Sequence, residues 1–209
     1  MAISTYTELK SAVANWLARA GDSAVTDNSA DFIMLAERRI NRSLRLRAME
    51  DRATATVSTE YVALPTGFLE MRNFQLNTNP ITRLEPMSPE QIDTIWAGST
   101  TGRPRVYCIL NDELQLRPAP DSGYTAEMAY WKAFDALSDA ATSNWLLANA
   151  PDLYLWGALA EAAPFIGDVE AGPLWEARFQ AAMKALQDSD DRGKWSGATP
   201  QVRTDTGSP

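Results

Sequence analysis

Apolar residues recur at helical spacing in the first and last thirds of the chain, and the pattern changes in the middle third. Near the N-terminus, the capping-box spacing of Thr5 and Glu8 predicts a helix over residues 5–19, which Gly21 ends. A second helix follows a polar loop and is predicted over residues 30–46. Its apolar stripe consists of Ile33, Ala36, Ile40 and Leu44.

The middle third has the composition of strands. It is rich in Thr, Val and aromatic residues from residue 53 to 85 and is divided by Pro- and Asn-containing turns, which favours short antiparallel strands. Ser88, Pro89 and Gln91 form a helix start signal, and a short helix is predicted to run from there through Trp96. Further strands are predicted over 105–110, 113–117 and 124–131.

Helical periodicity returns over residues 144–149, 151–166 and 174–190. The stretch from Pro151 to Phe165 is apolar on nearly every side, which is typical of a helix inside a bundle or between subunits. We expect Trp156 to supply a large rigid contact there, and the small Gly157 to let another helix come close. Both residues are predicted to lie at a contact between subunits.

The last 17 residues, 193–209, contain Gly, Ser, Thr and Pro without periodicity, which predicts an extended arm that becomes ordered only against a partner. The expected anchors of this docking arm are Trp195, Pro200, Val202 and Arg203. The predicted fold class is α+β. Residues 1–46 and 133–192 form a helical bundle, and residues 47–132 form an inserted small antiparallel β domain with one short helix.

Composition removes several classes of function. The chain has 209 residues, a net charge of −8, one cysteine and no histidine. Catalysis by Ser-His or Cys-His pairs and metal binding by histidine are therefore excluded, and no cofactor or metal is expected. An acidic chain is a poor match for a free-standing nucleic-acid binder or an anionic membrane surface, and no window is long enough to span a bilayer. A single cysteine indicates a reducing compartment, the cytoplasm.

Six arginines between residues 38 and 52 make one strongly basic stretch: Arg38, Arg39, Arg42, Arg45, Arg47 and Arg52. On a helix, Arg38, Arg42 and Arg45 share a face, and we favour their pairing with carboxylates of a neighbouring subunit. A solvated helix face is the plainer interpretation. Contact with DNA phosphates, as in a DNA-binding module that uses the stretch from Arg38 to Arg52, is the third.

Other chemically suggestive residues have plainer explanations. Acids such as Asp188, Asp190 and Asp191 would serve a hydrolase only if they converged in a cleft, so charged surface is the preferred interpretation. The glycine-rich loop from Gly98 to Pro104 lacks the ending of a phosphate-binding loop. Cys108 lies in a predicted strand and has no catalytic partner.

Several segments together resemble the head-to-tail adaptor, or connector, proteins of tailed bacteriophages. They begin with TYTELKSAVANWLARA, IMLAERRINRSLRLRAMEDRATATVS and YVALPTGFLEMR. They continue with TTGRPRVYCI, LQLRPAP, NWLLANAPDLYLWGALAEAAPF and WEARFQAAMKAL, and cover most of residues 5 to 190 in order. The specificity lies in the series, because no single segment is a chemical signature.

The resemblance implies a non-enzymatic, structural virion protein, made in the host cytoplasm and placed at the head–tail interface. It implies a homo-oligomeric ring, commonly a dodecamer, that binds the portal protein, presents a platform to tail or nozzle proteins and takes part in DNA ejection by letting DNA pass through its lumen. No membrane partner is implied. The arm of residues 193–209 would then dock on the portal or on an adjacent subunit.

Overall fold

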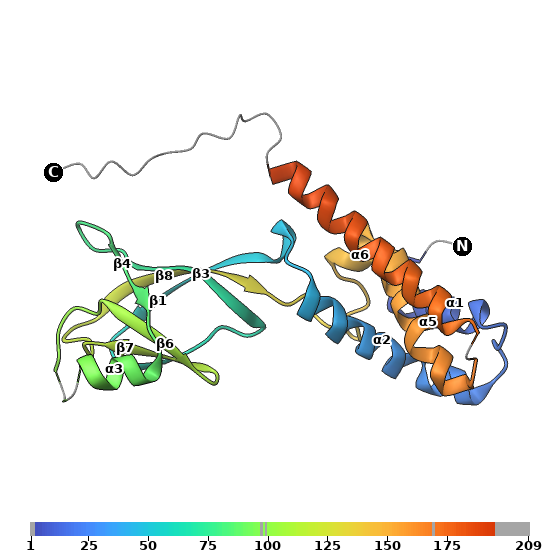
Figure 1. Cartoon of the computed structure of the whole chain (residues 1–209), viewed down its shortest axis with the longest axis horizontal. Coiled ribbons are helices and arrows are strands. Elements are labelled where there is room, and N and C mark those ends of the chain that lie inside the picture. The colour runs from blue at the N-terminus through green and yellow to red at the C-terminus, as the bar shows by residue number, and fades with distance from the viewer. Residues whose placement is uncertain (1–2, 97, 99, 169, 195–209) are drawn as a thin grey trace. The chain divides into compact units, whose positions relative to one another are not determined.

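The computed structural model describes residues 3–96, 98, 100–168 and 170–194. Within these residues the chain forms six α-helices, one short 3-10 helix and eight strands (Figure 1). The helices are α1 (Tyr6–Trp16), α2 (Ser23–Ser43), α3 (Pro89–Ile95), α4 (Trp145–Asn149), α5 (Pro151–Ile166) and α6 (Gly172–Lys194), and the 3-10 helix is Arg47–Met49. The strands are β1 (Glu50–Val57), β2 (Tyr61–Ala63), β3 (Phe68–Leu76), β4 (Thr82–Arg83), β5 (Glu85–Pro86), β6 (Val106–Leu110), β7 (Glu113–Arg117) and β8 (Tyr124–Lys132).

The contacts divide the chain into two compact units. The helical unit comprises residues 1–47 and 134–209, and the β unit comprises residues 48–133. All eight described strands lie in the β unit, which also contains α3, and the predicted α+β fold class is confirmed.

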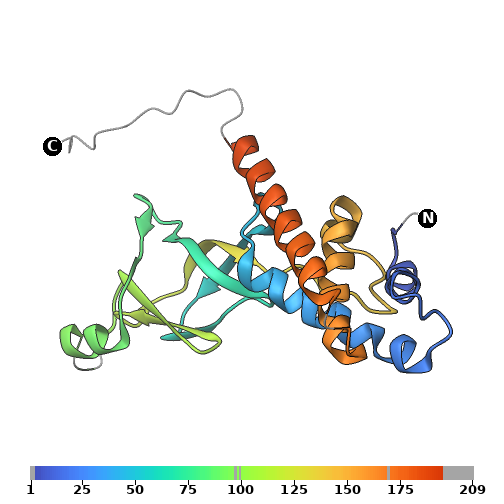
Figure 2. The ribbon, with the colours of Figure 1, turned by 45° about the vertical axis from the view of Figure 1, so that its right-hand side comes forward.

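In the helical unit, α5 packs against α1, α2, α4 and α6, and Figure 2 shows α6 running along α5. The predicted bounds of α5 are confirmed: Pro151 is its first residue, and Gly167 ends it with φ +73°. Glycine adopts this left-handed conformation without a steric penalty, because it has no β-carbon, and the conformation ends the helix. Eight residues of α5 are buried, so its predicted place inside the helical unit is also confirmed.

Several helix ends differ from the sequence prediction, among them the end of α2, at Ser43 rather than residue 46, and both ends of α6, at Gly172 and Lys194 rather than residues 174 and 190. The second helix, α2, begins at Ser23 rather than near residue 30, because the Asp22 carboxylate caps it by accepting the Ala24 N–H at 3.0 Å. The first helix, α1, ends at Trp16 rather than at residue 19. It ends before Gly21 because Ala18 already adopts the left-handed conformation, with φ 54°.

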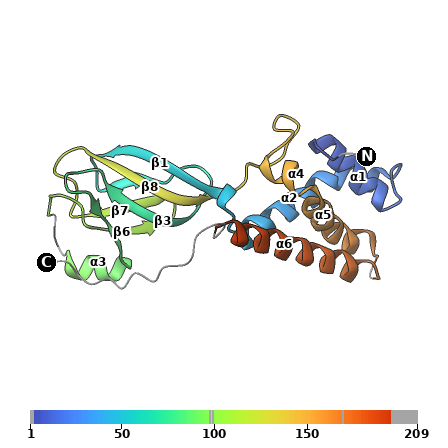
Figure 3. The same cartoon turned by 90° about the horizontal axis from the view of Figure 1, so that it is seen from above.

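The β unit contains two four-stranded sheets, with the strand orders β1-β8-β3-β4 and β2-β7-β6-β5. Figure 3 shows β1, β8 and β3 side by side. Side chains from both sheets meet in one core: Val57, Phe74, Leu76, Leu84, Tyr107, Leu114, Leu116, Ala126, Met128 and Tyr130. The other face of β6 is covered by α3 through Ile92, which packs on Val106 and Cys108. Cys108 is therefore a buried strand residue, as predicted.

One strand pair corrects the expectation of an antiparallel β domain. Strands β5 and β6 are parallel, and α3 lies between them in the chain. A chain that leaves a strand and returns in the same direction needs a crossover, and a helix commonly supplies it.

Candidate functional site

Arg39 joins three helices of the helical unit. From α2, its guanidinium donates to Glu161 Oε1 of α5 at 2.7 Å and to Glu176 Oε1 of α6 at 2.6 Å. Its Cζ lies 4.7 Å from the centre of the Phe179 ring. The hydrogen bond to Glu176 raises the pKa of Arg39 and lowers that of Glu176. This arginine therefore holds helices of its own chain together.

Two further arginines of the basic stretch are neutralised within their own units. In the helical unit, Arg47 Nε donates to Asp190 Oδ1 at 3.0 Å, and the Arg47 backbone N–H donates to Asp190 Oδ2 at 3.1 Å. In the β unit, Arg52 donates to Glu127 Oε2 at 2.6 Å. Arg39, Arg47 and Arg52 thus pair with carboxylates of the same chain.

The three arginines predicted to share a helix face are arranged differently. Arg38 and Arg42 are exposed on α2, and Arg42 Nε donates to the Arg38 carbonyl at 3.1 Å. Arg45 lies beyond the last helical residue, Ser43, and its guanidinium donates to the carbonyls of Asn41 and Leu44. Only Arg38 and Arg42 therefore lie on one helix, and their contact with a neighbouring subunit remains a prediction.

Gly157 is buried, and helices of its own chain pack closely against it. A β-carbon placed on Gly157 would lie 2.9 Å from Ala36 Cβ of α2 and 2.9 Å from Phe179 Cε2 of α6. The helix approach predicted at this glycine is therefore made within the helical unit. The position beside Gly157 is already filled, so it is not the subunit contact that the sequence suggested.

Trp156 belongs to a cluster of three tryptophans from three helices. Its ring stacks on Trp175 of α6, with the centroids 5.7 Å apart and the planes at 6°. Trp16, the last residue of α1, meets Trp156 edge-on at 5.0 Å and Trp175 edge-on at 5.9 Å. Trp16 follows Leu9 and Val13 at helical spacing, which predicts a place on the apolar face of α1, but its side chain is 50% exposed. These rings are far apart in the sequence, so no local pattern brings them together.

A buried carboxylate, Glu37, lies at the centre of a polar network that the sequence did not indicate. Its Oε1 accepts the Leu137 N–H at 2.9 Å and the Tyr154 hydroxyl at 3.1 Å, and Asn144 donates to that hydroxyl at 2.8 Å. Burial raises the pKa of Glu37 despite these two donors. The network connects α2 and α5 with the segment before α4, which is a structural role.

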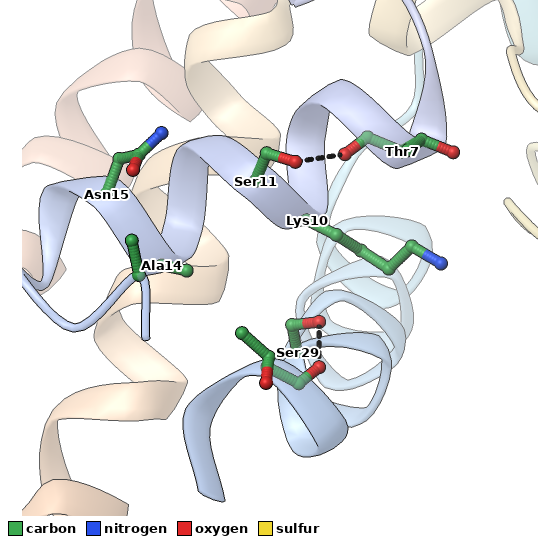
Figure 4. A pocket seen from close by; sticks show the side chains of 8 residues that line it. Thr7, Lys10, Ser11, Ala14, Asn15 and Ser29 are labelled. Atoms are coloured by element: carbon green, nitrogen blue, oxygen red, sulfur yellow. Dashed lines mark hydrogen bonds between the residues drawn. The ribbon is translucent and has the colours of Figure 1, made fainter. Parts of the chain in front are cut away.

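The cavity in Figure 4 lies in the helical unit and has a volume of about 450 Å³. Its two serine hydroxyls are occupied locally: Ser11 donates to the Thr7 carbonyl at 3.0 Å, and Ser29 donates to the Thr26 carbonyl at 2.8 Å. Lys10 forms an ion pair with Asp139 at 2.8 Å. No carboxylate lines this cavity among the described residues, so the acids that a hydrolase requires do not converge here.

The acidic residues near the end of α6 also have structural partners. Asp190 binds Arg47, and Asp191 accepts from Lys194 at 2.8 Å and from Gln187 at 3.3 Å. Across the described ranges, no group of three or more acidic or cysteine side chains is arranged to hold a metal ion. No described helix is long and apolar enough to cross a membrane.

The predicted docking arm overlaps the end of α6. This helix continues through Lys194, so Gly193, expected to be the first residue of the arm, is helical. The four predicted anchors, Trp195, Pro200, Val202 and Arg203, lie outside the described residues.

The chain matches a known protein family over nearly its whole length. The model of one family, described as SU10 adaptor protein, matches residues 4–204, which include almost all of both units. No curated protein matched the chain. Because the family match extends over nearly the whole length, the chain belongs to the SU10 adaptor protein family and is a structural adaptor protein of a phage.

Proposed function

We propose that this chain is one subunit of a ring-shaped adaptor that joins the portal to the tail of the virion and lets DNA pass through its lumen. The observation that carries the proposal is the family match over residues 4–204. Adaptor proteins act through surfaces that other proteins cover, and the helical unit offers such surfaces.

Large apolar side chains are exposed on the helical unit. They are Trp16, Met34, Leu35, Trp145, Phe165 and Leu174. Tryptophan and methionine are enriched where proteins meet, and burying such side chains against a neighbour removes apolar area from water. Contacts with further copies and with other virion proteins would cover these groups.

The charges favour passage of DNA over its retention. A chain with net charge −8 does not attract phosphates as a whole. The rival function, a DNA-binding module, needs the stretch from Arg38 to Arg52 to be free, yet Arg39, Arg47 and Arg52 pair with carboxylates of this chain. Salt-dependent retention of the protein on DNA would favour the rival.

Particle mass and shape test the ring directly. The purified chain is weighed by mass photometry and imaged by electron microscopy, alone and after mixing with a portal. We expect a closed ring whose mass is an integer multiple of the chain's mass, seated on the portal. A protein that stays monomeric in both samples and does not bind the portal would overturn the proposal.

We assign portal attachment to the arm that follows α6, with Trp195, Pro200, Val202 and Arg203 as its anchors. Removing residues 195–209 should weaken portal attachment and leave the melting temperature nearly unchanged, and Trp195→Ala should cause a good part of the loss. The matched control removes only residues 204–209, which keeps all four anchors. Full-strength attachment by the longer truncation would move the portal contact to the helical unit.

A further inference from the structure

The tryptophan cluster of Trp16, Trp156 and Trp175 carries a cation on its surface. Arg178 of α6 lies over two of these rings, with its Cζ 4.9 Å from the centre of Trp156 and 5.6 Å from that of Trp175. Contact with the ring faces restricts the guanidinium and leaves its N–H edge available. Among the described residues, Arg178 forms no ion pair, so this edge lacks a carboxylate.

Exposed apolar groups lie beside this arginine. Leu174 is one helical turn before Arg178 on α6, and both Leu174 and Trp16 are 50% exposed. Tryptophan and arginine dominate the binding energy of protein interfaces when they lie in a compact patch. We name Trp16, Leu174, Trp175 and Arg178 the aromatic patch; it fits a partner with a carboxylate next to an apolar side chain.

The outer face of α2 has that composition. Its inner face buries Phe32, Ile33, Ala36 and Ile40, which turns Asp27, Asp31, Met34 and Leu35 outward. Met34 and Leu35 are each 44% exposed. Asp27 and Asp31 form no ion pair within the described part of the chain. We name these four outward residues the acidic patch.

The two patches match in charge and in spacing. Asp31 is four residues before Leu35, and Arg178 is four residues after Leu174, so each charge lies one turn, about 6 Å along the axis, from its apolar neighbour. The order is reversed between the helices. An antiparallel approach of α2 to α6 would therefore place Asp31 opposite Arg178 and Leu35 opposite Leu174.

We propose that the acidic patch of one copy docks, antiparallel, on the aromatic patch of the next copy. The key groups of both patches are exposed, so the described residues of the same chain do not cover them. A contact between two different patches of identical subunits is heterologous, and such contacts close into rings when the rotation allows. The inference rests on the proposed ring and names the contact that forms it.

Charge reversal and its rescue test this contact. Asp31→Arg and Arg178→Glu are each measured alone and in combination, by mass photometry of the full chain with and without a portal. Each single reversal puts like charges in every interface and should weaken assembly by about tenfold or more. The double variant restores an opposite pair in every interface and should recover assembly to nearly that of the parent chain.

Lys184→Glu is the matched control, because it makes the same charge change at an exposed position of α6 outside the aromatic patch. It should assemble like the parent, and circular dichroism should show all variants folded. A parent that forms no ring with or without the portal overturns the proposed function, and this contact with it. If the parent and the single reversals all assemble, the contact alone is overturned. The contact alone is also overturned if the parent assembles but the double variant does not recover assembly. Loss of portal binding by Arg178→Glu with intact rings would assign the aromatic patch to the portal.

Discussion

Replacing Gly157 by alanine tests the packing of α5 against its two neighbours. The new β-carbon would lie 2.9 Å from both Ala36 Cβ and Phe179 Cε2, whereas carbon atoms in good contact are about 3.5–4.0 Å apart. Ala36 Cβ is fixed to the α2 backbone and cannot rotate away. The Phe179 ring is fully buried beneath Arg39. The helices must therefore separate, or the ring must leave its place.

The expected loss follows from two opposing effects. Overpacking of a filled core costs about 1–3 kcal/mol, and the better helix propensity of alanine returns about 0.8–1.0 kcal/mol. Because one of the two clashes is with a rigid β-carbon, we expect a net loss of about 1–2 kcal/mol in the free energy of unfolding. The melting temperature should fall by roughly 2–8 °C.

Urea unfolding of the helical signal, measured by circular dichroism, gives the free energy. Gly172→Ala is the control, because its new β-carbon would lie 3.6 Å from Ala163 Cβ, an ordinary contact. The control should be as stable as the parent or slightly more stable. If Gly157→Ala gained stability to a similar extent, α2 and α6 would not close on α5 at this position, and the reasoning would be wrong.

Three further substitutions test other parts of the helical unit by urea unfolding. Burial raises the pKa of Glu37 above 4.5, so the parent loses stability as the pH rises from below 4.5 through that raised pKa. Glu37→Gln keeps an acceptor for Leu137 and Tyr154 but cannot ionise, so it should gain stability relative to the parent as the pH rises from below 4.5; parallel profiles would refute this. Thr5→Ala removes the capping box of α1 and should cost about 0.5–2 kcal/mol, and an unchanged midpoint would show that the cap contributes nothing. Arg39→Lys keeps the charge but loses the planar guanidinium that reaches both Glu161 and Glu176, and should lower the free energy of unfolding by about 1–2 kcal/mol. An unchanged unfolding midpoint would show that these two ion pairs do not hold the helices together.

Elements with local signals can be predicted from the amino-acid sequence. Thr5 and Glu8 make the predicted capping box, Ser88 caps α3, and α5 runs from Pro151 to the residue before Gly167. Caps, prolines and terminal glycines act on backbone groups within about one turn, so they can be recognised without a fold. The division into helical and strand-forming thirds has the same origin, because hydrophobic period and β-branched content are properties of neighbouring residues.

Which side chains meet depends on long-range packing, which no local pattern shows. Arg39 and Glu161 are 122 positions apart, and nothing near Arg39 in the sequence distinguishes it from the exposed Arg38. Trp16 continues an apolar stripe, yet it is half exposed, and what covers the rest of it is Trp156 of α5 and Trp175 of α6. Glu37 directly precedes the basic stretch, and only the tertiary structure shows that Leu137 and Tyr154 donate to its buried carboxylate. Periodicity shows which face of a helix is apolar, but long-range packing determines what covers that face and leaves other groups exposed to partners.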